Sequence, residues 1–286
     1  MYYYEKGLDY ATMAVACVSA SQLVGRRDEN KLFVQQRHQA IIQKINKEKS
    51  VVVSDLIEMF GVSFETVRRD LEFLEKEGFL KRVHGGAILA DIDYKKEQPL
   101  TFRETKFVEE KKQLVELATK YVEEGQSIAL DVSTTNTEFA RALKRKFERL
   151  TIITNSLPIA NELVEKPDYT IILTGGVIRN QERGVIGELA EAFVSQFHAD
   201  LFFMSVSGIS LEEGITDYGI GEIQLKKIMH KNAKKTIALA DSSKFDVVSL
   251  IKVCAIDEVE RIVTDSLIDR EIVDKYTNHG IQIVYE

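Results

Sequence analysis

The stretch FGVSFETVRRDLEFLEKEGFLKRVHGG, residues 60–86, carries two adjacent arginines, Arg68 and Arg69, within a segment rich in carboxylates. Ser63 is a residue type that caps helix N-termini. Three apolar residues then recur at the i, i+4, i+7 spacing of a buried helix face: Val67, Leu71 and Leu74. This spacing predicts a helix that turns both arginines toward solvent.

A shorter helix is predicted just upstream of this one. Ser54 is its candidate N-cap, and Gly61 forms the tight corner between the two helices. Its expected inner face consists of Leu56, Ile57 and Phe60. Two short helices joined at such a corner predict a helix-turn-helix. After Gly78, the runs FLKRV and AIL predict two strands, closed by HGG, which add a wing.

The wing and the second helix carry the candidate DNA contacts. In a helix-turn-helix the first half of the second helix enters the major groove, where a guanidinium can bind guanine edges or phosphate through two hydrogen bonds. The candidate DNA-binding residues are Ser63, Thr66, Arg68, Arg69, Lys81, Arg82 and His84. When the helix is considered alone, an alternative explains its sequence equally well. In that alternative its outer face is simply solvated, and Glu65 and Glu72 form ion pairs with the arginines.

Composition bounds the remaining classes of function. With 286 residues and 44% hydrophobic residues the chain is long enough for two domains. Its net charge is −7, and residues 33–90 carry nine basic and eight acidic side chains, so DNA binding must be argued from position rather than total charge. The two cysteines form no disulfide or zinc motif, which favours a cytoplasmic protein without metal or cofactor. No run is long enough to span a bilayer, and residues 1–32 are expected to be a poorly ordered extension.

Residues 37–89 resemble the N-terminal domain of DeoR-family transcriptional regulators, a winged helix-turn-helix. The most specific part is the run SFETVRRDL, followed by Gly78 and by His84-Gly85-Gly86. The resemblance implies that Arg68 and Arg69 contact double-stranded operator DNA. It also implies that Ser63 and Thr66 hold the helix on the DNA backbone.

The second half of the chain has a different pattern. Residues 91–107 are polar and without sustained period, which predicts a linker, and a helix over 108–122 follows. Seven apolar runs then alternate with helical patterns: SIALD, TIIT, TIILTGG, LFFMSVSG, TIALADSS, RIVTD and IQIVY. This alternation predicts a Rossmann-like α/β domain over 108–286, with a mostly parallel sheet covered on both faces.

Polar residues follow several of these strands, where α/β sheets bind ligands. Ser133 and the threonines after it precede a predicted helix, and hydroxyls at a helix N-terminus favour an oxyanion, although they are also ordinary caps. No Walker-type loop or dinucleotide glycine motif is present. A small phosphorylated molecule with hydroxyl groups is therefore the expected ligand.

This half is similar to the DeoR-family sensor domain, whose fold is related to ribose-5-phosphate isomerase. The matching stretches include LDVSTTNTEFARAL, LTGGVIR and ALADSSKF. The resemblance implies a phosphorylated sugar or polyol effector, bound or supported by Asp131, Ser133, Thr134, Thr135, Asn155, Gly175, Gly176, Glu222, Lys226 and Lys244. The chain departs from the family at Val132-Ser133, where Ser-Gly is common, and at Ser205 and Ser207, where glycine and then an acidic residue often stand.

The expected function is a transcriptional repressor of a sugar or polyol operon that the effector releases from its operator. A homo-oligomer, dimer or tetramer, is expected because two-fold symmetry matches a palindromic site. Two alternatives remain: a sugar-phosphate isomerase and an architectural DNA-binding protein without effector. Glu222 and Lys226 also fit an ordinary surface pair four residues apart. Cys254 and the run of residues 202–204 are expected in the core.

Overall fold

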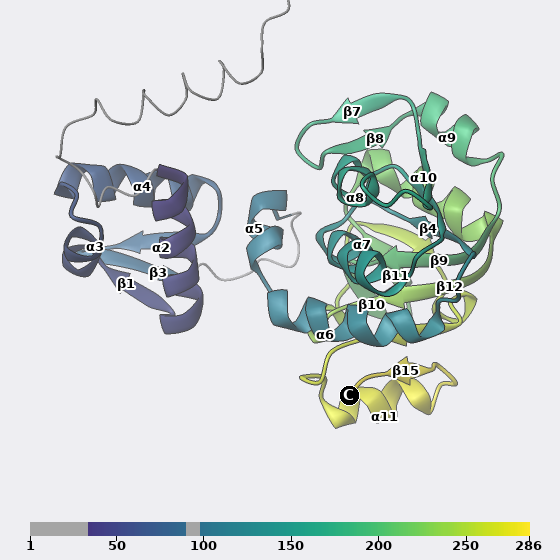
Figure 1. Cartoon of the computed structure of the whole chain (residues 1–286). Helices are drawn as coiled ribbons and strands as arrows, with labels where there is room; N and C mark the ends of the chain where they lie inside the picture. The colour runs from purple at the N-terminus through teal and green to yellow at the C-terminus, as the bar shows by residue number, and fades with distance from the viewer. Residues whose placement is uncertain (1–33, 90–97) are drawn as a thin grey trace, which may run out of the picture. The chain divides into compact units, whose positions relative to one another are not determined.

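The computed structural model describes residues 34–89 and 98–286, and the chain divides into two compact units (Figure 1). The first is built mainly from residues before Leu89 and the second mainly from residues after it. The predicted N-terminal extension, residues 1–32, lies outside the described residues, as does the first part of the predicted linker. In the described part of the chain, no helix is long and apolar enough to cross a membrane.

The first unit contains the predicted helix-turn-helix and wing. Its elements are α2 (Val34–Glu48), β1 (Ser50–Val52), α3 (Val53–Phe60), α4 (Phe64–Lys76), β2 (Leu80–Val83) and β3 (Gly86–Leu89). Gly61 ends α3 in the left-handed conformation, φ 60°, which forms the predicted corner. The strands pair in the order β1-β3-β2. A Cβ on Gly86 would lie 2.2 Å from the carbonyl oxygen of Val51, so only glycine allows β1 and β3 to approach this closely.

The helix caps of this unit agree with the sequence at one site and not at the other. The Thr66 N–H donates to Ser63 Oγ at 3.2 Å, so the predicted cap of α4 is confirmed. The predicted Ser54 cap is wrong, because α3 begins two residues earlier than this cap requires, and its N-cap position is Val52, without a side-chain cap. The buried residues that join the helices are Ile41, Ile45, Leu56, Phe60, Val67, Leu71 and Leu74.

The second unit is built on a seven-stranded parallel sheet of order β15-β14-β12-β9-β4-β5-β6. Its strands in chain order are β4 (Ser127–Leu130), β5 (Thr151–Thr154), β6 (Thr170–Leu173), β9 (Ala199–Ser205), β12 (Ala233–Leu239), β14 (Arg261–Val263) and β15 (Ile283–Val284). All seven correspond to the predicted apolar runs. The chain builds outward from β4 to β6 and returns beside β4 with β9, so the order of strands reverses between β4 and β9.

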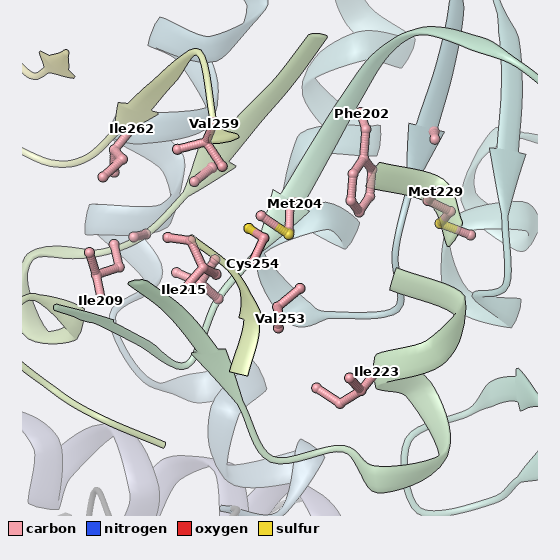
Figure 2. Packing of buried hydrophobic residues seen from close by; sticks show 14 of the residues in the cluster. Phe202, Met204, Ile209, Ile215, Ile223, Met229, Val253, Cys254, Val259 and Ile262 are labelled. Carbon is pink, nitrogen blue, oxygen red and sulfur yellow. The ribbon is translucent and has the colours of Figure 1, made fainter. Parts of the chain in front are cut away.

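Helices cover both faces of this sheet. Three pack on one face: α6 (Val108–Ala118), which continues into a 3-10 turn η2 (Thr119–Tyr121), α7 (Thr134–Lys146) and α8 (Leu157–Leu163). The other face carries α9 (Glu188–Val194), α10 (Ile220–Asn232) and α11 (Arg270–Thr277). Strand β9 contributes side chains to both cores. Phe203 belongs to the core under the first set of helices, and Phe202 and Met204 belong to the core under the second set, where Figure 2 shows them.

Several short elements have no counterpart in the sequence prediction. They are α5 (Leu100–Thr105), the hairpin β7 (Val177–Arg179) and β8 (Gly184–Ile186), the antiparallel sheet β10 (Gly208–Ser210), β11 (Gly214–Asp217) and β13 (Ile251–Cys254), and the 3-10 turns η3 (Ser242–Lys244) and η4 (Ile256–Glu258). Each is too short to show a hydrophobic period. Cys254 is buried, as expected, and belongs to the same hydrophobic cluster as Met204 (Figure 2). Helix α5 lies inside the predicted linker, where Leu100 and Phe102 are buried.

Candidate DNA-binding surface and ligand pocket

The two arginines of α4 are exposed and paired within their own helix. The side chains of Arg68 and Arg69 are 47% and 76% exposed. Arg68 Nη2 lies 2.8 Å from Glu65 Oε1, and Arg69 Nε lies 3.4 Å from the same oxygen. The hydrogen bond from Arg68 is the main reason that the pKa of Glu65 falls to about 2. Any DNA contact of these guanidinium groups would have to compete with Glu65, because the ion pairs occupy the surface predicted to read DNA.

The other predicted DNA contacts lie on the same helix start and on the wing. Ser63 Oγ is 2.9 Å from Thr66 Oγ1, at the N-terminus of α4. Lys81 and Arg82 of β2 are exposed, as is His84 in the turn before β3. A helix N-terminus and exposed cations suit contacts to phosphate rather than to base edges.

Sequence reasoning missed Asp70, the residue that fixes α4 in place. Its carboxylate is 4% exposed and accepts hydrogen bonds from Arg37 Nε at 2.8 Å and from Arg37 Nη2 at 3.0 Å. His38 Nε2 lies 3.0 Å from the same carboxylate. A signal was available, because Asp70 follows Val67 by three residues and precedes Leu74 by four, which is the spacing of the buried face.

Substitution of the α4 arginines is expected to remove operator discrimination. Arg68→Ala or Arg69→Ala should lower the preference for operator over random duplex by about 1–3 kcal/mol for each base that the arginine reads. Lys81→Ala or Arg82→Ala should weaken all duplexes alike and flatten the salt dependence by about one unit per phosphate bound. Fluorescence anisotropy across a salt series measures both quantities. Unchanged discrimination in an Arg68→Ala/Arg69→Ala variant would contradict the assignment.

The second unit has a pocket at the carboxyl ends of β4, β9 and β12, beside the reversal of strand order. Ligands of α/β sheets bind at such a position. From the strand ends, the lining residues are Val132, Ser133, Thr134, Thr135, Ser205, Val206, Ser207, Asp241 and Lys244. From the remaining elements they are Gln98, Phe102, Arg103, Lys106, Phe107, Lys111, Glu182, Asp217, Tyr218 and Glu222.

One wall of the pocket is the N-terminus of α7. Ser133 Oγ accepts a hydrogen bond from the Asn136 N–H at 2.9 Å, which caps the helix. The backbone N–H groups of Thr134 and Thr135 belong to the first turn, where an α-helix supplies no acceptor. Together with the helix dipole they favour an anion. The three predicted residues 133–135 thus line the pocket with donor groups.

The predicted residues Asp131 and Lys226 lie beneath the pocket in a buried ion-pair cluster. Lys226 Nζ is 2.7 Å from Asp131 Oδ2 and also pairs with Asp217. Burial alone would lower the pKa of Lys226, but the two carboxylates outweigh it and raise the pKa. Ser205 Oγ donates to Asp131 at 2.8 Å, and Ser207 Oγ donates to Asp217 at 2.6 Å. The two serines that depart from the family pattern therefore hold the carboxylates of this cluster.

Glu222 lines the pocket but does not form the surface pair with Lys226 that its spacing suggested. It accepts a hydrogen bond from Arg179 Nη1 at 3.1 Å, while Lys226 is only 4% exposed. Burial, reinforced by the nearby carboxylate of Glu182, raises the pKa of Glu222 to about 7. The surface-pair alternative is therefore wrong for this helix.

This shift predicts a pH dependence of stability. A carboxyl whose pKa is raised on folding stabilises the folded state below its unfolded pKa, and that contribution is lost as the pH rises through the folded value. The second unit should therefore lose stability between about pH 5 and about pH 8. Glu222→Gln should flatten this part of the profile and raise the melting temperature at pH 8, whereas the exposed Glu188→Gln control should not. Parallel profiles for wild type and Glu222→Gln would rule the effect out.

Besides Asp131 and Lys226, three further predicted residues do not line this pocket. Asn155 is 1% exposed, accepts a hydrogen bond from the Val132 N–H at 3.0 Å and donates to the Val185 carbonyl at 3.1 Å, so it supports the loop from behind. Gly175 and Gly176 follow the edge strand β6, which is separated from the strand reversal by β5. A Cβ on Gly176 would lie 2.9 Å from the Ile186 carbonyl oxygen, so this glycine serves the β7–β8 hairpin.

Sequence reasoning also missed the pocket cations that precede the sheet. They are Arg103, Lys106 and Lys111, and Arg103 forms an ion pair with Glu182. Lys111 had a recognisable signal, because it lies three residues before Leu114 and four before Val115 on the buried face of α6. Within residues 34–89 and 98–286, no group of His, Cys, Asp or Glu side chains could hold a metal ion.

A winged helix-turn-helix joined to an α/β domain with a polar pocket at its strand ends is the architecture of a two-domain DNA-binding regulator. The family model of the DeoR-like helix-turn-helix domain matches residues 37–93, and that of the DeoR C terminal sensor domain matches residues 106–266. The chain belongs to the DeoR family of transcriptional regulators, as the resemblance predicted.

Individual relatives match over nearly their whole length. The HTH-type transcriptional regulator GolR of Listeria innocua is 34% identical over 88% of this chain and 98% of its own. The Glycerol-3-phosphate regulon repressor of Escherichia coli is 32% identical over 87% of this chain and 97% of its own. Among solved structures, ribose 5-phosphate isomerase A from Methanocaldococcus jannaschii is 18% identical over 47% of this chain and 53% of its own, with a TM-score of 0.35.

Proposed function

We propose that this regulator is a repressor whose second unit binds a phosphorylated sugar or polyol, and that this ligand releases the operator. The observation that carries the proposal is the pocket at the strand reversal, where the first turn of α7 lies with Lys106, Lys111 and Lys244 around one cavity. A phosphate group suits helix N–H donors and ammonium groups. The hydroxyls and carboxylates on the same cavity suit the hydroxyl groups of a sugar or polyol.

The names of the relatives support the direction of regulation. The Escherichia coli relative is named a repressor of a glycerol-3-phosphate regulon, which joins repression to a small polyol phosphate. For the present chain we propose an effector of the same chemical class, a small polyol or sugar phosphate, and not glycerol 3-phosphate in particular. The effector is a small molecule with one phosphate and several hydroxyl groups.

A panel of sugar and polyol phosphates tests the proposal. The active member should raise the melting temperature and release operator DNA, while its unphosphorylated parent does neither at equal concentration. A ligand at 100 times its dissociation constant adds about 2.7 kcal/mol to stability. Thr134→Ala/Lys244→Ala should keep operator affinity and lose the response, whereas the exposed pair Thr277→Ala/Lys231→Ala should respond like wild type. A normal response from the first double variant would place the site elsewhere.

We further propose that the pocket binds its ligand without converting it. Lys226 is held between two carboxylates, so its ammonium is not available as an electrophile for aldose–ketose isomerisation. Glu222 has the raised pKa of a candidate base, but its carboxylate is paired with Arg179. The ligand recovered from the titration is expected unchanged by chromatography. Steady product formation would favour the isomerase alternative.

We also propose that the regulator works in the cytoplasm as a homo-oligomer. Four large apolar side chains are exposed on β7, α9 and α10 of the second unit, namely Val177, Ile178, Leu189 and Ile220. Exposed apolar groups on adjacent elements are typical of association surfaces. A second copy of the chain would bring two winged helix-turn-helix domains to the two halves of a palindromic operator.

A further inference from the structure

The positive charge of the pocket comes mainly from the segment that connects the two units in sequence. Four pocket-lining side chains have basic groups: Arg103, Lys106, Lys111 and Lys244. Only Lys244 follows a strand of the sheet; the other three lie on α5, on the turn after it and on α6. An anion held by the N-terminus of α7 would therefore be neutralised largely by residues 103–111.

The same cations hold α5 against the rest of the second unit. Lys111 Nζ donates to the backbone carbonyls of Lys106, at 2.8 Å, and of Arg103, at the C-terminal end of α5. The ammonium of Lys106 lies 5.1 Å from the ring centre of Phe102, which is buried. Arg103 pairs with Glu182, which is only 3% exposed. Helix α5 is thus anchored by groups that also line the pocket.

Phe107 joins α5 to α6 in an unusual backbone conformation. Its φ is 53°, in the left-handed region that residues with a side chain rarely adopt. Its ring lies 5.7 Å from Nζ of Lys244, which also lines the pocket. A residue held in this conformation costs on the order of 1–3 kcal/mol and persists where surrounding contacts enforce it. The junction between α5 and α6 is therefore held in place by contacts that include a basic residue of the pocket.

The basic groups of the pocket act on one another and on the carboxylates of the same lining, which are Glu182, Asp217, Glu222 and Asp241. Burial lowers the pKa of Lys111 to about 8, and the charges of Lys244 and Arg103 lower it further, whereas Asp241 opposes the shift. A phosphate dianion at the N-terminus of α7 would attract each basic group and favour the charged form of Lys111. Anion binding should therefore tighten α5 onto the pocket.

We propose that residues 98–111 form part of the effector site, with Lys106 as a direct anion ligand, so that effector binding stabilises α5. This proposal rests on the function proposed above. It adds the segment through which effector binding affects the connection to the DNA-binding unit. Only residues 90–99 separate α5 from β3 of the wing in sequence. Stabilisation of α5 by the ligand then acts at the start of the covalent connection to the DNA-binding unit.

Hydrogen–deuterium exchange of the full-length protein tests the proposal, with inorganic phosphate as the probe and chloride at matched ionic strength as the reference. In wild type, phosphate should slow exchange of the amides in residues 98–107 as well as in residues 133–136. Lys106→Met, which keeps the packing volume, should require about tenfold more phosphate for half-maximal protection of residues 133–136, since a charge-assisted hydrogen bond is worth about 1.5 kcal/mol or more. It should also lose the protection of residues 98–107.

The control and the contrary outcomes separate this proposal from the proposed function. Lys112→Met removes the same charge from the exposed side of α6 and should behave like wild type. Protection confined to residues 133–136 in wild type would leave the phosphate site in place and overturn the role of α5. Absence of protection at both segments would overturn the site itself. The wild-type measurement decides between these outcomes even if Lys106→Met folds poorly.

Discussion

Lys226→Met is expected to destabilise the second unit by about 3–5 kcal/mol, because it leaves buried carboxylates without their cation. Asp131 and Lys226 have side chains that are each 5% exposed, and Asp217 is 18% exposed. Methionine nearly fills the volume of lysine, so the loss is electrostatic rather than a cavity effect. Urea unfolding followed by circular dichroism measures the change.

The control for this prediction is Lys227→Met, which removes the same charge from the next position on α10. Lys227 is partly exposed and should cost much less. Restoring neutrality by adding Asp131→Asn and Asp217→Asn to Lys226→Met should recover a large part of the lost stability, since no buried charge then lacks a partner. Equal unfolding midpoints for Lys226→Met and Lys227→Met would show that the cluster is not important for stability.

Asp70→Ala is expected to have the second large effect, this time on the DNA-binding unit. It leaves Arg37, which is 7% exposed, buried without its two charge-assisted hydrogen bonds. Removing one partner of a buried ion pair typically costs about 3–5 kcal/mol. Operator binding should be lost through unfolding of the first unit, while the melting transition of the second unit stays where it is.

Differential scanning calorimetry with operator binding on the same samples checks this prediction. Asp55→Ala removes an exposed carboxylate from α3 and should change stability by less than about 1 kcal/mol. The result also separates Asp70→Ala from Arg68→Ala, which should lose discrimination with the fold intact. Full operator affinity in Asp70→Ala would contradict the structural role of this ion pair.

Regular elements could be predicted from the sequence because their signals are local. The spacing of Val67, Leu71 and Leu74 marks α4, and Gly61 marks the corner before it. The seven sheet strands are apolar runs that stand out from the helical patterns between them. Elements of three or four residues, such as β7 and β10, contain no complete period and were missed.

The candidate site could be predicted only in part, for the same reason. Residues 133–135 combine a helix N-terminus with hydroxyl groups in one continuous stretch, and the structure places them in the pocket. Gly175 and Gly176 also follow a strand and looked like a similar candidate site, but their strand lies at the edge of the sheet. The order of strands in a sheet cannot be predicted from a short segment of sequence. No sequence pattern near Lys106 or Arg103 predicts that they line the pocket, because the residues that share the pocket with them come from distant parts of the chain.

Local patterns in the chain were thus enough to define the two kinds of domain, the exposed arginines of α4 and the hydroxyl-rich turn after β4. The packing of the whole chain was needed to show which polar residues share a cavity and which are buried ion-pair partners. Asp131 meets Ser205 and Lys226 because β9 returns beside β4 and α10 then packs on β9. Hydrophobic burial determines that arrangement over the whole chain, and the cost of leaving buried charges unpaired then selects which side chains meet.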